Sequence, residues 1–302
     1  MDRTPAFILL YLMRGIPPFG RKALLLLCAS FTSFVQAQVR PAYALFDGKG
    51  KKLSEKQMVR LVGEGDVILF GELHNNPIAH WMELVVMREL LAQGPLVIGA
   101  EMVEADDQAA VDQYLRGEVD AEGLDTLASL WPNHKTDYAP LLAFAKEKQL
   151  PFVATNVPRR YARAVSKGGF EALDTVPLNE RSWIAPLPIA FDPGLPGYVK
   201  MLTMMGEHGG PNTVKAQALK DATMAHFIAA NTKPGARFVH FNGSYHSDFH
   251  EAIGWYLKRA RPELKQVTIA TITQEDMSTL AKEHHGKADI IICVDALMPS
   301  SY

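Results

Sequence analysis

Apolar runs alternate with amphipathic segments along most of the chain. Short, nearly continuous apolar runs predict buried strands at 67–70, 96–100, 152–156, 237–241, 267–272 and 289–294. Apolar residues at helical spacing predict helices at 55–62, 77–92, 106–115, 121–131, 138–148, 158–167, 213–231 and 248–259. Residues 38–53 are expected to form an extended lead-in. This alternation predicts an α/β fold with a mainly parallel central sheet flanked by helices.

The alternation breaks between about 176 and 212, where prolines and glycines concentrate. Within this stretch, residues 198–205 predict a short helix that is rich in methionine. We interpret the stretch as a small helical lid insertion within one α/β domain that covers residues 38–302.

The methionine-rich helix allows two interpretations. Methionines at helical spacing, such as Met201, Met204 and Met205, usually pack into a core. They can also form a soft apolar surface for a flat ligand such as a porphyrin. In that case Tyr198 or His208 would supply an axial oxygen or nitrogen atom, with Met204 beside the ligand.

The N-terminus has the pattern of a targeting segment. Basic residues precede an apolar run at 23–29, and Val35 and Ala37 fit the small-residue cleavage rule. We expect a signal peptide at 1–37 and an exported protein, either periplasmic or membrane-associated. A lipid anchor at Cys28 is an alternative, although Leu27 stands where such an anchor requires a small residue.

Two further alternatives at the N-terminus stay open. The apolar run could remain as an uncleaved anchor, although it is short for a membrane span. Met13 rather than Met1 could be the true start, because residues 1–12 would make the basic region unusually long.

Charge and cysteine content narrow the chemistry. The whole chain has 31 basic and 33 acidic residues, and without residues 1–37 these fall to 27 and 32. No basic stripe stands out, which argues against a nucleic-acid partner. Cys293 would then be the only cysteine, so a disulfide within the chain and a cysteine-based zinc site are excluded. Any metal must be held by His, Asp or Glu.

Acidic and imidazole groups follow several predicted strands. Glu72 and His74 follow the strand at 67–70, Glu101 follows the next, and His246 follows the strand at 237–241. Both histidines close a Gly-x-x-His corner. Because carboxyl ends of parallel strands share one edge of a sheet, we expect these four residues to meet. Such a set suits Zn²⁺, Mn²⁺, Co²⁺ or Fe²⁺, or general acid–base chemistry. In the structural alternative, Glu72 caps the following helix and His74 satisfies backbone groups.

Two more charged residues could belong to this edge. Arg159 follows the strand at 152–156, where an arginine can orient an anionic substrate group. Alternatively it pairs with Glu101 or Asp221, or is solvated. Asp221 lies in the middle of a predicted helix, and we expect it on a solvated or salt-bridged face.

An ordered set of short motifs resembles the ChaN-like haem-binding uptake family of the Tiki superfamily. The set comprises Gly71-Glu72-Leu73-His74, Glu101-Met102, Asn156-x-Pro158-Arg159, the stretch from Gln217 to Met224, and Gly243-Ser244-Tyr245-His246. The resemblance implies an α/β sheet domain with a smaller helical part and a bacterial exported or membrane-associated protein. It also implies haem as ligand, a role in haem and iron acquisition, and an outer-membrane haem receptor system as partner.

The same resemblance implies kinship with metal-dependent proteases and esterases. Their roles map onto His74 and His246 as metal ligands, and onto Glu72 and Glu101 as ligand or general base. Two functions therefore remain open, a haem-binding protein and a metal-dependent hydrolase. A haem shared across a homodimer is one arrangement left open.

Overall fold

The computed structural model describes residues 41–206 and 210–302, and residues 42–302 form one compact unit. The predicted signal peptide at 1–37, with Cys28 and Met13, lies outside the described residues, as does His208. In the described part, no helix is long and apolar enough to cross a membrane.

The unit is built on one eight-stranded sheet with the order β2-β1-β8-β7-β3-β6-β4-β5. Strands β3 to β8 run parallel to one another, while β1 pairs with β8 and with β2 in antiparallel fashion. The strands are β1 (Tyr43–Asp47), β2 (Lys52–Leu53), β3 (Val67–Glu72), β4 (Leu96–Glu104), β5 (Phe152–Asn156), β6 (Arg237–Gly243), β7 (Gln266–Gln274) and β8 (Ile290–Asp295). The predicted mainly parallel sheet is confirmed.

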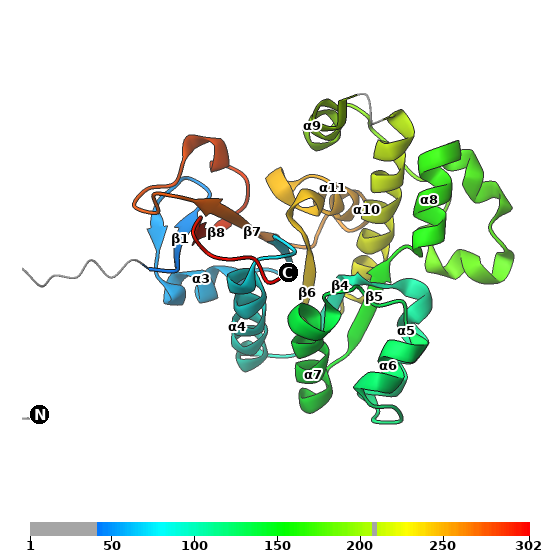
Figure 1. Ribbon diagram of the computed structural model, residues 1–302, viewed down its shortest axis with the longest axis horizontal. Helices are drawn as coiled ribbons and strands as arrows, with labels where there is room; N and C mark the ends of the chain where they lie inside the picture. Colours follow the sequence, from blue (N-terminus) through cyan, green and yellow to red (C-terminus); the bar gives the residue numbers. More distant parts are fainter. Residues whose placement is uncertain (1–40, 207–209) are drawn as a thin grey trace, which may run out of the picture. The chain divides into compact units, whose positions relative to one another are not determined.

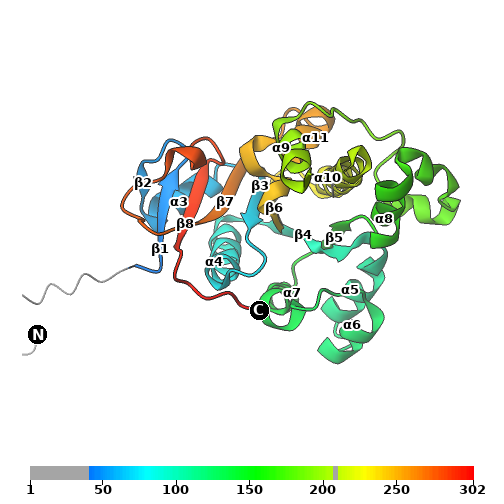
Figure 2. The same cartoon turned by 45° about the horizontal axis from the view of Figure 1, so that its top comes forward.

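Helices cover both faces of this sheet (Figures 1 and 2). The α-helices are α3 (Glu55–Val62), α4 (Pro77–Gln93), α5 (Gln108–Leu115), α6 (Ala121–Leu127), α7 (Ala139–Lys148), α8 (Arg159–Gly168), α9 (Pro196–Met205), α10 (Pro211–Asn231) and α11 (Ile253–Ala260). Residues of α3, α4, α5 and α7 pack in one core cluster, and residues of α8, α10 and α11 pack in another. Flanking helices on both faces explain why the central strands are apolar without alternation.

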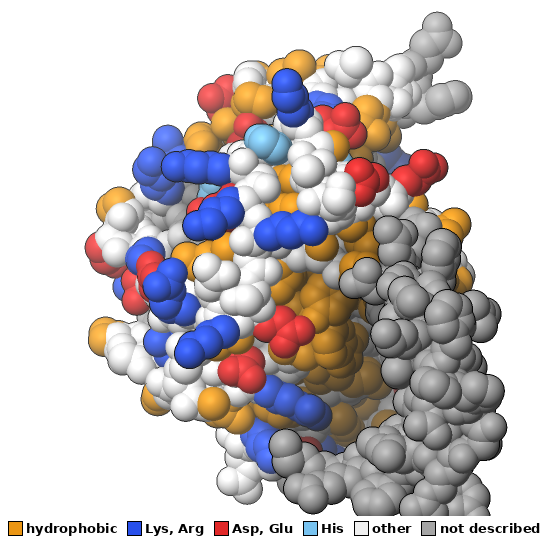
Figure 3. All heavy atoms as spheres, turned by 90° about the vertical axis from the view of Figure 1, so that its left-hand side faces the viewer, with side chains coloured by type: hydrophobic (Ala, Val, Ile, Leu, Met, Phe, Trp, Pro, Cys, Tyr) orange, Lys and Arg blue, Asp and Glu red, His pale blue; other side chains and the backbone are white. Residues whose placement is uncertain are grey.

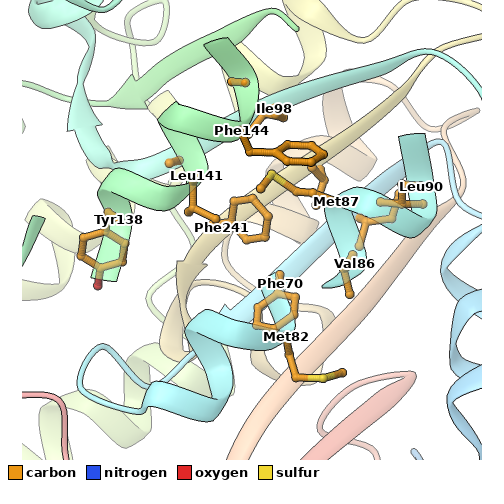
Figure 4. Close-up of a cluster of buried hydrophobic side chains, with 14 of the residues drawn as sticks. Phe70, Met82, Val86, Met87, Leu90, Ile98, Tyr138, Leu141, Phe144 and Phe241 are labelled. Carbon is orange, nitrogen blue, oxygen red and sulfur yellow. The ribbon is translucent and has the colours of Figure 1, made fainter. Parts of the chain in front are cut away.

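The core on the α4 side is aromatic and methionine-rich (Figure 4). Phe70 of β3 and Phe241 of β6 lie with ring centroids 5.7 Å apart, and Met82 and Met87 of α4 pack in the same cluster. Tyr138 lies at the border of this cluster, with its hydroxyl directed away from the apolar side chains. The core therefore ends at a polar region beyond the carboxyl ends of the strands.

Three sequence-based boundaries are corrected. The lead-in at 38–53 contains β1 and β2, and β1 pairs with β8. The helix expected at 248–259 begins only at Ile253, because Phe249, His250 and Ala252 have positive φ angles that no α-helix accommodates. The helix expected at 121–131 ends at Leu127.

The 176–212 stretch packs onto the unit rather than standing apart from it. Val176, Ile184 and Ile189 are buried against α8 and α10. The helix α9 packs on α10 through Tyr198, which contacts Val214 and Ala218. On the outer surface, acidic and basic side chains are interspersed over the face drawn in Figure 3.

Candidate functional site

The four predicted strand-end residues lie at one edge of the sheet. Because β6 lies between β3 and β4, the carboxyl ends of these strands are neighbours. Glu72 is the last residue of β3 and Glu101 lies in β4, while His74 and His246 follow β3 and β6. After β3 the chain forms β4, and it later returns to form β6 between these two strands. Such crossover points are where α/β sheets bind ligands.

Glu72 and His74 form a hydrogen-bonded pair. His74 Nδ1 lies 2.6 Å from Glu72 Oε1, and the Tyr138 hydroxyl donates to the same oxygen at 2.7 Å. The Trp131 ring packs against the imidazole with centroids 4.9 Å apart. Burial lowers the pKa of His74, but Glu72 and Glu101 outweigh it and raise that pKa. The His74 side chain is 36% exposed, and Nδ1 is the nitrogen that Glu72 engages.

The second oxygen of Glu72 faces two residues of α4. His80 Nδ1 lies 3.1 Å from Glu72 Oε2 and 3.4 Å from Glu83 Oε2, and His80 Nε2 lies 3.1 Å from the His74 carbonyl oxygen. We call Glu72, His80 and Glu83 the α4 cluster. All three side chains are buried.

The three groups of the α4 cluster have pKa values that are shifted in different directions. Burial raises the pKa of Glu72, but hydrogen bonds with His74 and His80 outweigh it and lower the value to about 2. Burial and the neighbouring Glu72 carboxylate raise the pKa of Glu83 well above its usual range. Burial lowers the pKa of His80, but the two carboxylates raise it to about 10. Of the two carboxyl groups in the cluster, Glu72 is therefore the more acidic one.

His246 is enclosed by two carboxylates. Its Nδ1 lies 2.5 Å from Asp221 Oδ1, and its Nε2 lies 3.1 Å from Glu101 Oε1. The Tyr198 hydroxyl donates to Asp221 Oδ2 at 2.7 Å, and the Gly243 amide donates to Glu101 Oε2 at 2.8 Å. Burial lowers the pKa of His246, but Glu101 and Asp221 raise it to about 9. Both nitrogens of this imidazolium are therefore occupied.

Close packing at the two corners explains their glycines. A Cβ on Gly243 would lie 2.7 Å from His74 Nε2 and 3.5 Å from Glu101 Oε2. A Cβ on Gly71 would lie 2.9 Å from Ser247 Oγ and 3.0 Å from the Ile269 carbonyl oxygen. The Gly243 position thus shows that His74 Nε2 and the Glu101 carboxylate approach the same point of the backbone.

These contacts define what the site can do. His74 is partly exposed and has a carboxylate on Nδ1, which is the arrangement of an oriented general base. A metal ion bound to both His74 and His246 would replace the contact between His246 and Glu101. The α4 cluster has the spacing of metal ligands. Within residues 41–206 and 210–302, it is the group of three acidic or imidazole residues whose ligand atoms all lie within 4.8 Å of one another.

Sequence and structure comparisons identify the family. A family model described as haem-binding uptake, Tiki superfamily, ChaN matches residues 58–257, which contain Glu72, His74, Glu101 and His246. The chain belongs to this ChaN family. A solved structure of ChaN from Campylobacter jejuni, described as showing cofacial haem binding, has a TM-score of 0.64 at 15% identity. That match covers 84% of this chain and 97% of the other, and it supports a shared fold.

A plant protein also matches the chain. Protein RETICULATA-RELATED 5, a chloroplastic protein of Arabidopsis thaliana, is 22% identical in an alignment of 276 residues that covers 84% of this chain. The match spans only 37% of the plant protein.

Two charged residues of this ChaN-family chain lie differently from the prediction. Arg159 Nε lies 3.5 Å from Glu104 Oε1, and its main-chain nitrogen donates to Glu104 Oε2 at 2.8 Å. Its partner is therefore Glu104 rather than Glu101 or Asp221, and its side chain is about half exposed. Asp221 is fully buried, so it is not on a solvated face, but the salt-bridged alternative holds because Asp221 pairs with His246. The Glu72 capping alternative is also wrong, because Asn76 caps α4.

The residues predicted to contact a flat ligand differ in their exposure. Tyr198 is buried, and its hydroxyl donates to Asp221. In this structure Tyr198 therefore positions Asp221, and its hydroxyl is not directed at a ligand as an axial group. Met204 is 62% exposed, and the Tyr245 hydroxyl lies 3.8 Å from its Sδ. His208 lies outside the described residues.

Sequence analysis missed His80, Glu83 and Tyr138. A signal for Glu83 was present, because it shares the buried face of α4 with Ala79, Met82 and Val86 at helical spacing. A charged residue in such an apolar stripe needs a partner. No comparable signal marked Tyr138, whose contact with Glu72 spans 66 positions of the chain.

Proposed function

We propose that this protein binds haem outside the cytoplasm and takes part in haem or iron uptake. Three observations support the proposal. The chain belongs to a family described as haem-binding, its fold resembles a ChaN structure described as binding haem, and its N-terminus has the pattern of an export signal. The observation that carries it is an exposed apolar surface beside His246.

This surface is formed by α9 and by the segment after β6. We call Met201, Met204, Tyr245 and Phe249 the α9 apolar face. Met201, Tyr245 and Phe249 line one small pocket, and Met204 contacts the Tyr245 hydroxyl. Met204, Tyr245 and Phe249 are 62%, 56% and 42% exposed. Exposed apolar side chains that gather in one place mark binding sites, and a porphyrin is a flat apolar ligand that fits such a face.

The polar groups around the face suit the remaining parts of haem. The exposed Lys200 lines the same pocket and could pair with a propionate. Met204 offers a thioether and Tyr245 a phenol, and both groups ligate haem iron in other proteins. We therefore assign the axial contact to Met204 or Tyr245.

Hemin titration followed by absorbance tests the proposal. We expect a saturable Soret change at micromolar hemin for the purified protein. Met204→Ala and Tyr245→Phe should weaken binding at least about tenfold or shift the band. Leu178→Ala, which removes an exposed apolar side chain outside the α9 apolar face, is the matched control. A wild-type protein without saturable binding, or face variants that behave like the control, would contradict the proposal.

A second candidate function is hydrolysis at His74. The observation that favours it is the contact of Nδ1 of the partly exposed His74 with Glu72, while Nε2 and the Glu101 carboxylate approach the same point of the backbone. His74 would accept a proton from water, and Glu72 would stabilise the imidazolium that forms. The donor set also suits a divalent metal, which would lower the pKa of a bound water when present. His74 and Glu101 would hold that metal, together with His246 once it leaves Glu101.

A screen of ester and peptide substrates tests this function. His74→Gln should lower kcat/KM by a factor of about 10²–10⁴, the usual contribution of general acid–base catalysis. His226→Gln on α10 is the control, because His226 lies outside the described contacts of Glu72 and His246. Turnover that persists in His74→Gln would refute a catalytic role for this dyad while leaving the haem proposal untouched.

A further inference from the structure

We propose that Glu72, His80 and Glu83 form a site for one divalent transition metal ion, with His80 bound through Nδ1. This site lies behind His74 and differs from a metal shared by His74 and His246. It depends neither on haem binding nor on hydrolysis.

Unsatisfied oxygens are the first observation for this site. Among the described residues, Glu83 Oε1 is a buried side-chain oxygen without a hydrogen-bond partner, and Glu72 Oε2 has the 3.1 Å ion-pair contact with His80 Nδ1 but no hydrogen bond. Glu72 is 1% exposed and Glu83 is fully buried. Buried polar atoms are nearly always satisfied, so an unpartnered carboxylate oxygen beside a second buried glutamate points to a missing cationic partner.

The spacing of the ligand atoms is the second observation. His80 Nδ1 lies 3.1 Å from Glu72 Oε2 and 3.4 Å from Glu83 Oε2, and one ligand atom of each residue lies within 4.8 Å of the others. Zinc binds imidazole nitrogen and carboxylate oxygen at about 2.0–2.2 Å, so adjacent ligands of a tetrahedral ion lie about 3.3–3.6 Å apart. The cluster therefore needs only small shifts to close on an ion.

The surroundings of His80 prepare Nδ1 as the ligand. His80 Nε2 lies 3.1 Å from the His74 carbonyl oxygen, which accepts only if Nε2 carries the proton. This contact leaves the Nδ1 lone pair directed at the two carboxylates when the ring is neutral. Histidine ligands of metals usually donate their other N–H to a carbonyl or carboxylate in this way.

Metal binding would also fix the position of His74. Glu72 would bind the ion through Oε2 while its Oε1 keeps the 2.6 Å contact with His74 Nδ1. Two glutamates and one neutral histidine balance the charge of a divalent ion. One imidazole and two carboxylates suit Zn²⁺, Mn²⁺, Fe²⁺ or Co²⁺ better than soft metals. A water molecule would complete the coordination.

Metal content after refolding tests the site. The full chain is unfolded in urea with chelator and refolded with Zn²⁺, because all three ligands are buried and metal entry into the folded protein is hindered. After dialysis, elemental analysis should find one zinc per chain. Glu83→Gln keeps the shape of a protonated Glu83 but cannot bind as a carboxylate, so its zinc affinity should fall at least about tenfold. Glu89→Gln, the same change at an exposed position of α4, should retain the metal.

Two further measurements separate the α4 cluster site from other metal sites. His246→Gln should still bind one zinc, which separates this site from one shared by both Gly-x-x-His corners. Cobalt refolded into the wild-type protein should give ligand-field absorption bands that Glu83→Gln loses. The proposal is overturned if the wild-type protein holds no stoichiometric metal, if Glu83→Gln binds as tightly as Glu89→Gln, or if His246→Gln abolishes binding. If Glu83→Gln fails to fold, the zinc-dependent rise in the Tm of the wild-type protein decides, and its absence refutes the site.

Discussion

The charge on His246 should make the stability of this protein depend on pH in a defined direction. Enclosure by Glu101 and Asp221 raises the pKa of His246 from 6.5 to about 9 in the folded state. Because the folded pKa is the higher one, the proton stabilises the folded protein. This contribution is fully present below pH 6.5 and is lost as pH rises through 9. One pKa unit corresponds to about 1.4 kcal/mol, so about 3 kcal/mol is at stake.

The variant His246→Gln isolates this contribution. Urea unfolding of wild-type and variant protein at several pH values between 6 and 9.5 gives two curves of unfolding free energy. His74 and His80 also have raised pKa values, but they remain in both proteins and largely cancel in the difference. We expect the advantage of the wild-type protein to shrink by about 3 kcal/mol across this range.

A control and a direct titration complete the assay. His226→Gln on α10 should not reproduce the pH-dependent loss seen for His246→Gln, because burial lowers the pKa of His226 rather than raising it. The imidazole proton signal of His246 in NMR spectra should titrate near pH 9. If the wild-type and His246→Gln curves run parallel within about 0.5 kcal/mol, the enclosure of a charged His246 by two carboxylates is refuted.

Three further predictions address single contacts. Gly243→Ala places a Cβ 2.7 Å from His74 Nε2, so it should destabilise the protein by about 1–3 kcal/mol in urea unfolding. It should also shift the His74 NMR signals, and unchanged signals would contradict the packing. Tyr198→Phe removes the hydrogen bond to Asp221 and should cost about 1–2 kcal/mol without changing the hemin spectrum, whereas an altered Soret band would restore Tyr198 as a ligand. Glu72→Gln should lower the pKa of His74 in an NMR titration, because the Glu72 carboxylate on Nδ1 helps to raise that pKa. A His74 pKa that stays raised would assign the effect to Glu101 alone.

Local sequence patterns determined the elements that carry the site. Apolar runs located the strands β3 to β8, and the polar residues after them identified Glu72, His74, Glu101 and His246. Their gathering followed from one general property, namely that parallel strands end at one edge. These predictions need only neighbours in the chain and the direction of a strand.

Contacts distant along the chain were decided by the tertiary structure alone. The insertion of β6 between β3 and β4 brings Glu101 to His246, and this strand order has no local signature. Burial of one face of α10 places Asp221 against His246, although the residue lies in mid-helix like a solvated one. Packing of α4 under the end of β3 places His80 and Glu83 against Glu72. The sequence thus identified the reactive groups at the strand ends, while helix packing selected the partners that set their charge.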